Sequence, residues 1–276
     1  MTARDHTRRP AVDSAARADS VSALARGFRV LHSFAPGVAA LSHQQIMRAT
    51  GLPKATVSRV TQTLVGLGYL DASHADGRFR LTAKTLDVGR IYLSNVDVRA
   101  IAQPLMAELA EYTRATVNLG VRSGDHIVVV ETCRTDATVI SVNVNIGFQF
   151  PILQTAIGRA YIAGLAPGAR AAAVKALRPT AAAHEWKALQ VRVAEAALGY
   201  DTHGFCAMWG EWRQGVNSVA APIRTGLDGE PYVINCAGPA PHLDPALLAT
   251  EAGPRLVHIV REVERAVNVS WQQGSS

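Results

Sequence analysis

Apolar residues recur at helical spacing on both sides of a break at residues 50–53. A short helix is predicted from Ser42 to Ala49, and Gly51 ends it because glycine adopts the left-handed conformation of a helix C-terminus at little cost. Pro53 then favours the first turn of a second helix, where its fixed φ fits and its missing N–H is not needed. The second helix carries one apolar stripe, made of Val57, Val60, Leu64 and Leu67. This pattern predicts a helix-turn-helix.

Elements on either side of this pair complete a larger unit. A helix is predicted before it, with Ser20 as N-cap and Pro36-Gly37 as its end; its apolar residues are Val21, Leu24, Phe28, Leu31 and Phe34. Two short strands, Tyr69-Leu70 and Phe79–Leu81, follow around the turn dipeptide Asp76-Gly77. Three helices and a β-hairpin wing over residues 20–82 predict a winged-helix domain.

Polar residues on the outer side of the second helix and along the wing are candidate DNA contacts. Lysine and arginine bind phosphates, and short hydroxyl or amide side chains reach base edges in a major groove. Ser58 and Gln62 could equally be ordinary surface residues, whereas Lys54 and Arg59 beside the turn are harder to explain in that way. We predict that double-stranded DNA is contacted by Lys54, Thr56, Ser58, Arg59, Gln62, Arg78 and Arg80.

The distribution of charge independently favours a nucleic-acid module at the N-terminal end. The chain of 276 residues carries a net charge of +6. Residues 1–98 hold 13 basic and 7 acidic side chains, and residues 99–276 hold 15 of each. All of the net positive charge therefore lies in the part that contains the helix-turn-helix. A neutral second domain is expected after it.

The second part of the chain mixes helical and strand periods. A flexible arm is predicted at residues 1–19, a linker helix at 83–98 and an α+β domain at 99–276. Its predicted helices are Ala100–Tyr112, Thr155–Leu165, Ala169–Leu177, Trp186–Leu198 and Pro245–Asn268. Its predicted strands are Thr116–Val121, His126–Cys133, Val139–Asn145, Ser218–Arg224 and Pro231–Ala237, with a turn at Gly226–Gly229 between the last two.

With these elements in order, the chain resembles the IclR family of bacterial transcription regulators over roughly residues 20–270. The resemblance is carried by the strings TGLPKATVSRVTQTLVGLGYL, GRFRL, TAIGRAYIAG and GVNSVAAPIRTGLDGEPYVINCAGP. It implies a GAF-like effector-binding domain, a homodimer or dimer of dimers on a palindromic operator, and a small organic acid as effector. It also implies that this effector sets DNA binding or contact with RNA polymerase.

The resemblance places an effector carboxylate on backbone amides at Ala156-Ile157-Gly158. Free N–H groups at a helix N-terminus favour an anion in any case, although Thr155 can equally serve only as the helix cap. Relatives that bind small keto acids have an acidic residue and two serines where this chain has Met208, Asn235 and Ala237. We therefore predict an aromatic acid as effector. The candidate contacts are Thr155, Ala156, Ile157, Gly158, Met208, Trp209 or Trp212, Ser218, Asn235 and Ala237.

Each of these residues also has an ordinary structural explanation. Trp209 and Trp212 can fill the core or an oligomer interface, and Asn235 can satisfy backbone groups within a strand. The combination of His203, Cys206 and Cys236 matches no closed tetrahedral spacing, so we expect no metal and no cofactor.

The alternative function is an enzyme with a DNA-binding appendage that acts on a small organic acid. Asp125, His126, Glu131 and Cys133 cluster around one strand, but strand alternation divides them between two faces. The common nucleophile, phosphate-loop, dinucleotide and zinc-protease motifs are missing from the sequence. Residues 1–19 lack the apolar segment of a signal peptide, and no apolar run suits a membrane span, so we expect a cytoplasmic protein without enzymatic activity.

Overall fold

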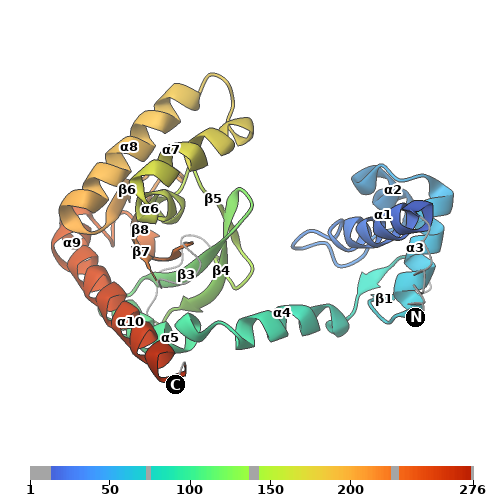
Figure 1. Cartoon of the computed structure of the whole chain (residues 1–276), viewed down its shortest axis with the longest axis horizontal. Coiled ribbons are helices and arrows are strands. Elements are labelled where there is room, and N and C mark those ends of the chain that lie inside the picture. The colour runs from blue at the N-terminus through green and yellow to red at the C-terminus, as the bar shows by residue number, and fades with distance from the viewer. Residues whose placement is uncertain (1–13, 73–75, 137–142, 225–229, 275–276) are drawn as a thin grey trace, which may run out of the picture. The chain divides into compact units, whose positions relative to one another are not determined.

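The computed structural model describes residues 14–72, 76–136, 143–224 and 230–274. The chain divides into two units, Met1–Tyr92 and Leu93–Ser276, and the division falls inside the predicted linker at residues 83–98 (Figure 1). Each unit has its own apolar core.

The first unit consists of three helices and a short hairpin. Leu41 and Phe79 form an antiparallel bridge that adds to the hairpin. The apolar core beneath the helices consists of Val30, Leu41, Ile46, Leu52, Val57, Leu64, Leu70 and Phe79. The elements are α1 (Ser14–Leu31), α2 (His43–Thr50), α3 (Lys54–Gly66), β1 (Leu70–Asp71) and β2 (Arg80–Leu81).

The turn between α2 and α3 has the predicted chemistry. Ser42 caps α2 in a capping box with Gln45, and Gly51 ends the helix with a φ of 66° while its N–H donates to the carbonyl of Met47. Pro53 is the N-cap of α3 instead of its first helical residue. The guanidinium of Arg29 in α1 donates to the carbonyl of Thr50, so it satisfies a free carbonyl at the end of α2.

Three predictions for this unit are wrong in detail. The first helix begins at Ser14, so Ser20 lies within the helix and is not its N-cap. Residues 14–19 of the predicted arm are therefore helical, and residues 1–13 lie outside the described residues. Leu67 follows α3 as its C-cap and is exposed, because the helix ends at Gly66, two residues after Leu64. The apolar stripe therefore stops at Leu64.

The predicted linker helix is divided. A 3₁₀ turn at Ala83–Thr85 leads into α4 (Leu86–Ser94), and α5 (Asp97–Thr113) begins after a two-residue interruption. Four large apolar side chains of this segment are exposed, namely Leu86, Val88, Ile91 and Tyr92.

A six-stranded antiparallel sheet forms the centre of the second unit. Its strand order is β5-β4-β3-β8-β7-β6, so the pairs β4–β5 and β6–β7 flank a central β3–β8 pair. The register places Asn118 of β3 opposite both Thr132 and Asn235. The strands are β3 (Thr116–Ser123), β4 (His126–Cys133), β5 (Gln149–Pro151), β6 (Cys206–Trp209), β7 (Val216–Ile223) and β8 (Tyr232–Pro239).

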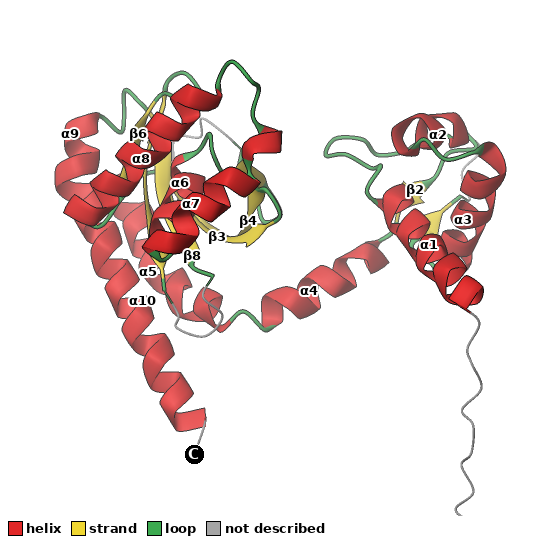
Figure 2. Cartoon of the chain, turned by 45° about the horizontal axis from the view of Figure 1, so that its top comes forward, coloured by secondary structure: helices red, strands yellow, loops and turns green. Residues whose placement is uncertain are grey.

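Helices cover both faces of this sheet (Figures 1 and 2). On one face, α5 packs with α10 (Gly253–Gly274), which is preceded by the single turn α9 (Pro245–Leu247) and a π-helical turn at Leu248–Ala252. On the other face lie α6 (Ala156–Gly164), α7 (Pro167–Ala176), a 3₁₀ turn at Arg178–Thr180 and α8 (Trp186–His203). Each face of the sheet has its own cluster of buried side chains, contributed by both strands and helices. The sequence of this unit therefore shows apolar residues at both strand and helix spacing.

The strand predictions were incomplete. Residues 143–145 do not form the predicted strand; the strand that pairs with β4 is β5, which lies later in the chain. Residues 139–142 and the predicted turn at Gly226–Gly229 lie outside the described residues. The edge strand β6 was missed altogether. The final helix begins near the predicted residue but is interrupted by the π-helical turn.

Candidate functional site

The predicted DNA contacts on α3 fall on two adjoining strips of its surface. The helix buries Val57, Thr61 and Leu64 against the core. Lys54, Ser58 and Gln62 are four residues apart and share one strip, with Ser58 half-buried and the other two exposed.

The second strip is formed by Thr56 and Arg59, three residues apart. Both border an apolar groove between α1 and α3, together with Phe28 of α1 and Leu81 of the wing. The helix therefore presents cations and hydrogen-bonding groups over a broad surface, which suits a helix that contacts DNA.

The wing places its two arginines differently. Arg78 is exposed, whereas Arg80 forms an ion pair with Asp76 at 2.9 Å. The carboxylate of Asp76 also accepts the backbone N–H of Arg78 at 3.1 Å, and these two interactions lower the pKa of Asp76. Arg80 is therefore already engaged at the turn of the wing, whereas Arg78 is exposed.

A small cavity lies between the N-terminal end of α6 and the face of the sheet. Its volume is about 40 Å³, and most of its surface is apolar. It brings together seven of the nine predicted effector contacts, from the start of α6 and from the strands β6, β7 and β8. The lining residues are Thr116, Asn118, Val144, Phe150, Thr155, Ala156, Ile157, Met208, Trp212, Arg213, Val216, Ser218, Asn235 and Ala237.

Thr155 organises the start of α6. Its hydroxyl donates to the carbonyl of Pro151 at 2.8 Å and accepts the N–H of Gly158 at 3.2 Å, so it acts as the N-cap. The backbone N–H groups of Ala156 and Ile157 have no partner among the described residues. These two amides are the first N–H groups of the helix, and both residues line the cavity, so the start of α6 favours an anion there.

The predicted effector contact at Gly158 stays a prediction. Gly158 is not part of the cavity wall, and its N–H already binds Thr155. A Cβ at this position would come within 2.3 Å of the carbonyl oxygen of Ile152. Glycine is therefore needed here because the helix packs directly on the backbone of the preceding segment.

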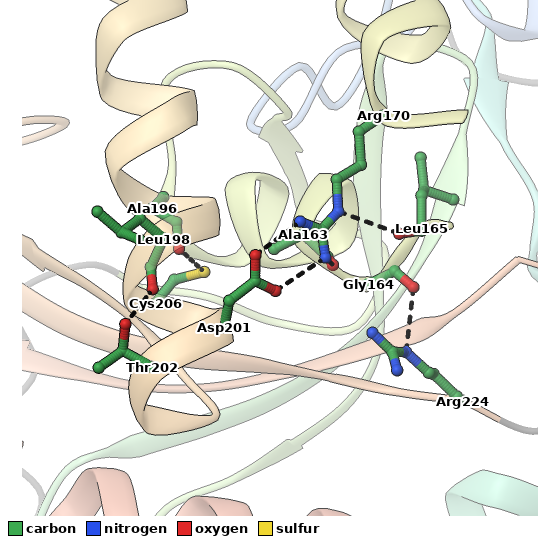
Figure 3. A network of polar contacts seen from close by, with 10 residues as sticks. All are labelled: Ala163, Gly164, Leu165, Arg170, Ala196, Leu198, Asp201, Thr202, Cys206 and Arg224. Carbon is green, nitrogen blue, oxygen red and sulfur yellow. Dashed lines mark hydrogen bonds and ion pairs between the residues drawn. The ribbon is translucent and has the colours of Figure 1, made fainter. Parts of the chain in front are cut away.

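Two arginines satisfy the carbonyl groups at the opposite end of α6 (Figure 3). Arg170 donates to the carbonyls of Ala163 at 2.6 Å and Leu165 at 3.1 Å, and Arg224 donates to that of Gly164 at 3.2 Å. Cations at a helix C-terminus interact favourably with its dipole. The ends of α6 thus differ, with carbonyls bound by cations at one end and free amides at the other.

A row of hydrogen bonds crosses the sheet at the floor of the cavity. Thr132 Oγ1 donates to Asn118 Oδ1 at 2.9 Å, Asn118 Nδ2 to Asn235 Oδ1 at 3.0 Å, and Asn235 Nδ2 to Ser218 Oγ at 3.2 Å. Asn118, Asn235 and Ser218 are more than nine-tenths buried. The row explains how three polar side chains are accommodated in the core of the unit.

The second tryptophan, not the first, belongs to the cavity. Met208 is opposite Ser218 in the β6–β7 register and is buried, whereas its neighbour Trp209 points to the other side and is 42% exposed. Trp212 lines the cavity, with its ring centroid 5.3 Å from that of Phe150. Trp209 is therefore removed from the candidate contacts.

Sequence reasoning missed several lining residues. Thr116 and Asn118 alternate with buried apolar residues of β3, a polar pattern on a buried face that could have identified them. Arg213 is exposed at the cavity, and its guanidinium lies 4.9 Å from the ring centroid of Trp212. Phe150 could not be found, because its strand was predicted elsewhere.

The residues considered for a metal site are far from forming one. Cys206 belongs to the core cluster on the α6 side of the sheet, and Cys236 belongs to the cluster on the α10 side. The Cys206 thiol donates to the carbonyl of Ala196 and that of Cys236 to Thr113, while His203 lies next to the Phe205 ring. Among the described residues, no group of histidine, cysteine and acidic side chains could hold a metal ion.

Comparison with known proteins identifies the family. Residues 23–73 match the IclR helix-turn-helix domain, and residues 90–268 match the family described as bacterial transcriptional regulator IclR C-terminal. The chain belongs to the IclR family. It is 30% identical over 245 residues to the HTH-type transcriptional regulator TsaQ1/TsaQ2 of Comamonas testosteroni, covering 88% of this chain and 87% of that protein.

Solved structures agree with this assignment. An IclR family transcriptional regulator from Brucella abortus superposes with a TM-score of 0.76 at 34% identity, over 89% of this chain and 92% of that one. An IclR homologue from Microbacterium hydrocarbonoxydans, complexed with 4-hydroxybenzoate, shares the fold at a TM-score of 0.70 and 20% identity, over 90% and 99% of the two chains. The predicted winged helix and α+β domain are confirmed, and the chain is a DNA-binding transcription regulator of the IclR type.

Proposed function

We propose that this IclR-type regulator is controlled by a small aromatic carboxylic acid that binds in the cavity at the start of α6. One observation carries the proposal. The same mainly apolar cavity is lined by Ala156 and Ile157, whose backbone amides are free, and by the aromatic residues Phe150 and Trp212. The amides suit a carboxylate, and the rings suit a flat apolar body.

The charge at the cavity supports an anionic ligand. Arg213 is exposed beside Trp212 and forms no ion pair among the described residues. Among the described residues that line the cavity, none is acidic. A cation and two free amides attract negative charge, and the carboxylate of the neighbouring Glu211 is paired with Arg159 and Arg192.

The apolar wall favours an aromatic acid over a short keto acid. Met208, Val144 and Val216 contribute apolar surface that a two- or three-carbon acid would leave without contacts. The homologue from Microbacterium hydrocarbonoxydans, which shares this fold, holds 4-hydroxybenzoate. That complex supports the choice of an aromatic acid for this chain.

Binding requires the cavity to open. A cavity needs roughly 10–15 Å³ to hold one water molecule, so about 40 Å³ accommodates only a few. We propose that Trp212 moves outward while its neighbour Glu211 stays anchored to Arg159 at 2.9 Å and Arg192 at 3.4 Å. The fluorescence of Trp212 should therefore report binding.

The regulator is proposed to act as a homodimer or dimer of dimers on a palindromic operator. The exposed apolar side chains of α4, including Leu86 and Ile91, supply surface that a second copy would cover. Binding of the acid would change the spacing of two helix-turn-helix units, and with it operator affinity. The same change is proposed to alter contact with RNA polymerase.

The alternative of an enzyme is not favoured by its candidate residues. Burial raises the pKa of the Cys133 thiol to about 11, which keeps it protonated and poorly nucleophilic at neutral pH. Glu131 is bound to Arg99 at 2.8 Å, and His126 to Asp125 at 2.8 Å.

Within the described ranges, no helix combines the length and apolar character of a membrane span.

Titration of the purified full chain with benzoate-type acids and with short keto acids tests the choice of ligand. Benzoate-type acids should change the tryptophan fluorescence and raise the melting temperature, with about 2.7 kcal/mol of stabilisation at a hundred times the dissociation constant. Trp212→Phe should abolish most of the fluorescence change, and Trp209→Phe should preserve it. A response to keto acids alone would refute the aromatic ligand.

A further inference from the structure

On the side formed by the sheet, the wall of the proposed effector cavity contains hydroxyl groups whose protons are not donated to any described residue. Thr116 is more than nine-tenths buried, lines the cavity and makes no side-chain hydrogen bond among the described residues. A hydroxyl in a mainly apolar wall that lacks a protein partner is open to a hydrogen bond with a molecule in the cavity. Such a group in a ligand cavity is explained when the ligand supplies the partner.

Ser218 also has a hydroxyl proton that is available for a ligand, although its oxygen is already bonded. Its oxygen accepts the side-chain amide of Asn235, and its own proton has no acceptor in the described part of the chain. The row that begins at Thr132 donates in one direction throughout, from Thr132 to Asn118, then to Asn235 and finally to Ser218. Hydrogen bonds in such a chain polarise one another, so the last hydroxyl is a strengthened donor.

The two hydroxyls lie close to each other in the strand register. Thr116 of β3 is opposite Ala237 of β8, and Ala237 is opposite Ser218 of β7. All three residues line the cavity, so Thr116 and Ser218 flank the small side chain of Ala237 on the same face of the sheet. Two hydroxyl groups therefore border this part of the cavity, and none of the described lining residues is acidic.

We propose that Thr116 and Ser218 recognise an oxygen substituent on the ring of the effector. The ligand is then an oxygen-substituted aromatic carboxylic acid, with its carboxylate at the amides of Ala156 and Ile157 and its second oxygen at the two hydroxyls. An unsubstituted or methyl-substituted ring would leave both donors unpaired. This inference rests on the proposed function, because it requires the cavity to be the effector site.

The test compares matched acids on the full-length protein by calorimetric titration. The probes are benzoate, 3- and 4-hydroxybenzoate, and 3- and 4-methylbenzoate, since a methyl group matches a hydroxyl in size without accepting a hydrogen bond. At least one hydroxybenzoate should bind about tenfold more tightly than the methylbenzoate substituted at the same position. Thr116→Val, which keeps the shape, and Ser218→Ala should each reduce this ratio towards one, and Thr116→Ser should retain it.

The possible failures are distinguishable. If all five acids bind with similar affinity, the proposed function stands and the role of the two hydroxyls is refuted. The same conclusion follows if Thr116→Val and Ser218→Ala weaken methyl- and hydroxybenzoates equally, which would indicate a structural role. If none of the acids binds while short keto acids do, the aromatic effector itself is refuted, and this inference with it.

Discussion

Asp201 of α8 holds Arg170 of α7 through two nitrogen–oxygen contacts of 3.1 Å, and the same guanidinium binds the last carbonyls of α6. This pair links three helices at one point (Figure 3). The ion pair lowers the pKa of Asp201. The helix whose N-terminal residues line the cavity is therefore fixed at its C-terminal end by charge.

Replacement of Arg170 by alanine should destabilise the effector domain. The carbonyls of Ala163 and Leu165 would lose a charged donor, at a cost of about 2 kcal/mol, or roughly 4–8 °C in melting temperature. Arg261→Ala on the exposed surface of α10 is the control and should change stability by less than about 0.5 kcal/mol. Equal melting curves for the two variants would show that Arg170 does not hold α6.

Ala156→Pro should selectively weaken binding of the acid. Ala156 is the first residue of α6, where proline is tolerated, and Thr155 before it already has the extended conformation that proline requires. The substitution removes one N–H from the anion site and should lower affinity for an aromatic acid at least tenfold, as measured by calorimetry. Ala156→Gly retains the N–H and should bind within a few-fold of the unaltered protein. Unchanged affinity in Ala156→Pro would place the carboxylate elsewhere.

The two classes of DNA contact should respond differently to salt. Arg59→Ala on α3 should cost about 1–3 kcal/mol on the preferred sequence and relax specificity if the side chain reads a base. Arg78→Ala in the wing should weaken all sequences alike and reduce the salt slope by about one. Arg80→Ala should have less effect on DNA binding than Arg78→Ala, because Arg80 is already paired with Asp76. Unchanged operator binding in Arg59→Ala would show that the assignment of α3 is wrong.

Buried thiols should make the effector domain sensitive to alkali. Burial raises the pKa of Cys206 to about 12 and that of Cys236 to about 11, from 9.0 in the unfolded chain. The folded state keeps these protons where the unfolded chain releases them, so their contribution to stability is complete below pH 9 and declines as pH rises towards 11–12. Urea midpoints across this range should fall, and Cys236→Ala should reduce the slope. An identical slope in that variant would contradict the assignment.

The sequence was sufficient for the elements that local chemistry determines. Gly51 and Thr155 each end or begin a helix through their own conformation or hydroxyl, and both lie where they were predicted. The family profiles confirm the order of the domains that these helices belong to.

What depends on register could not be predicted. Trp209 and Trp212 are equally apolar in the sequence, and only the pairing of β6 with β7 shows that the first points away from the cavity. The partner of Arg80 depends on how the wing folds back on Asp76, and the row from Thr132 to Ser218 requires four strands in register.

The most direct test measures the affinity of the full-length protein for its operator as the concentration of aromatic acid increases. The operator can be enriched from a random pool of duplexes with the unliganded protein. Binding of the acid should change operator affinity by about five- to 150-fold, and the operator should change the affinity for the acid by the same factor. In Ala156→Pro the same change should require a higher concentration of acid. An operator affinity that stays constant at acid concentrations that saturate the Trp212 fluorescence change would contradict the account.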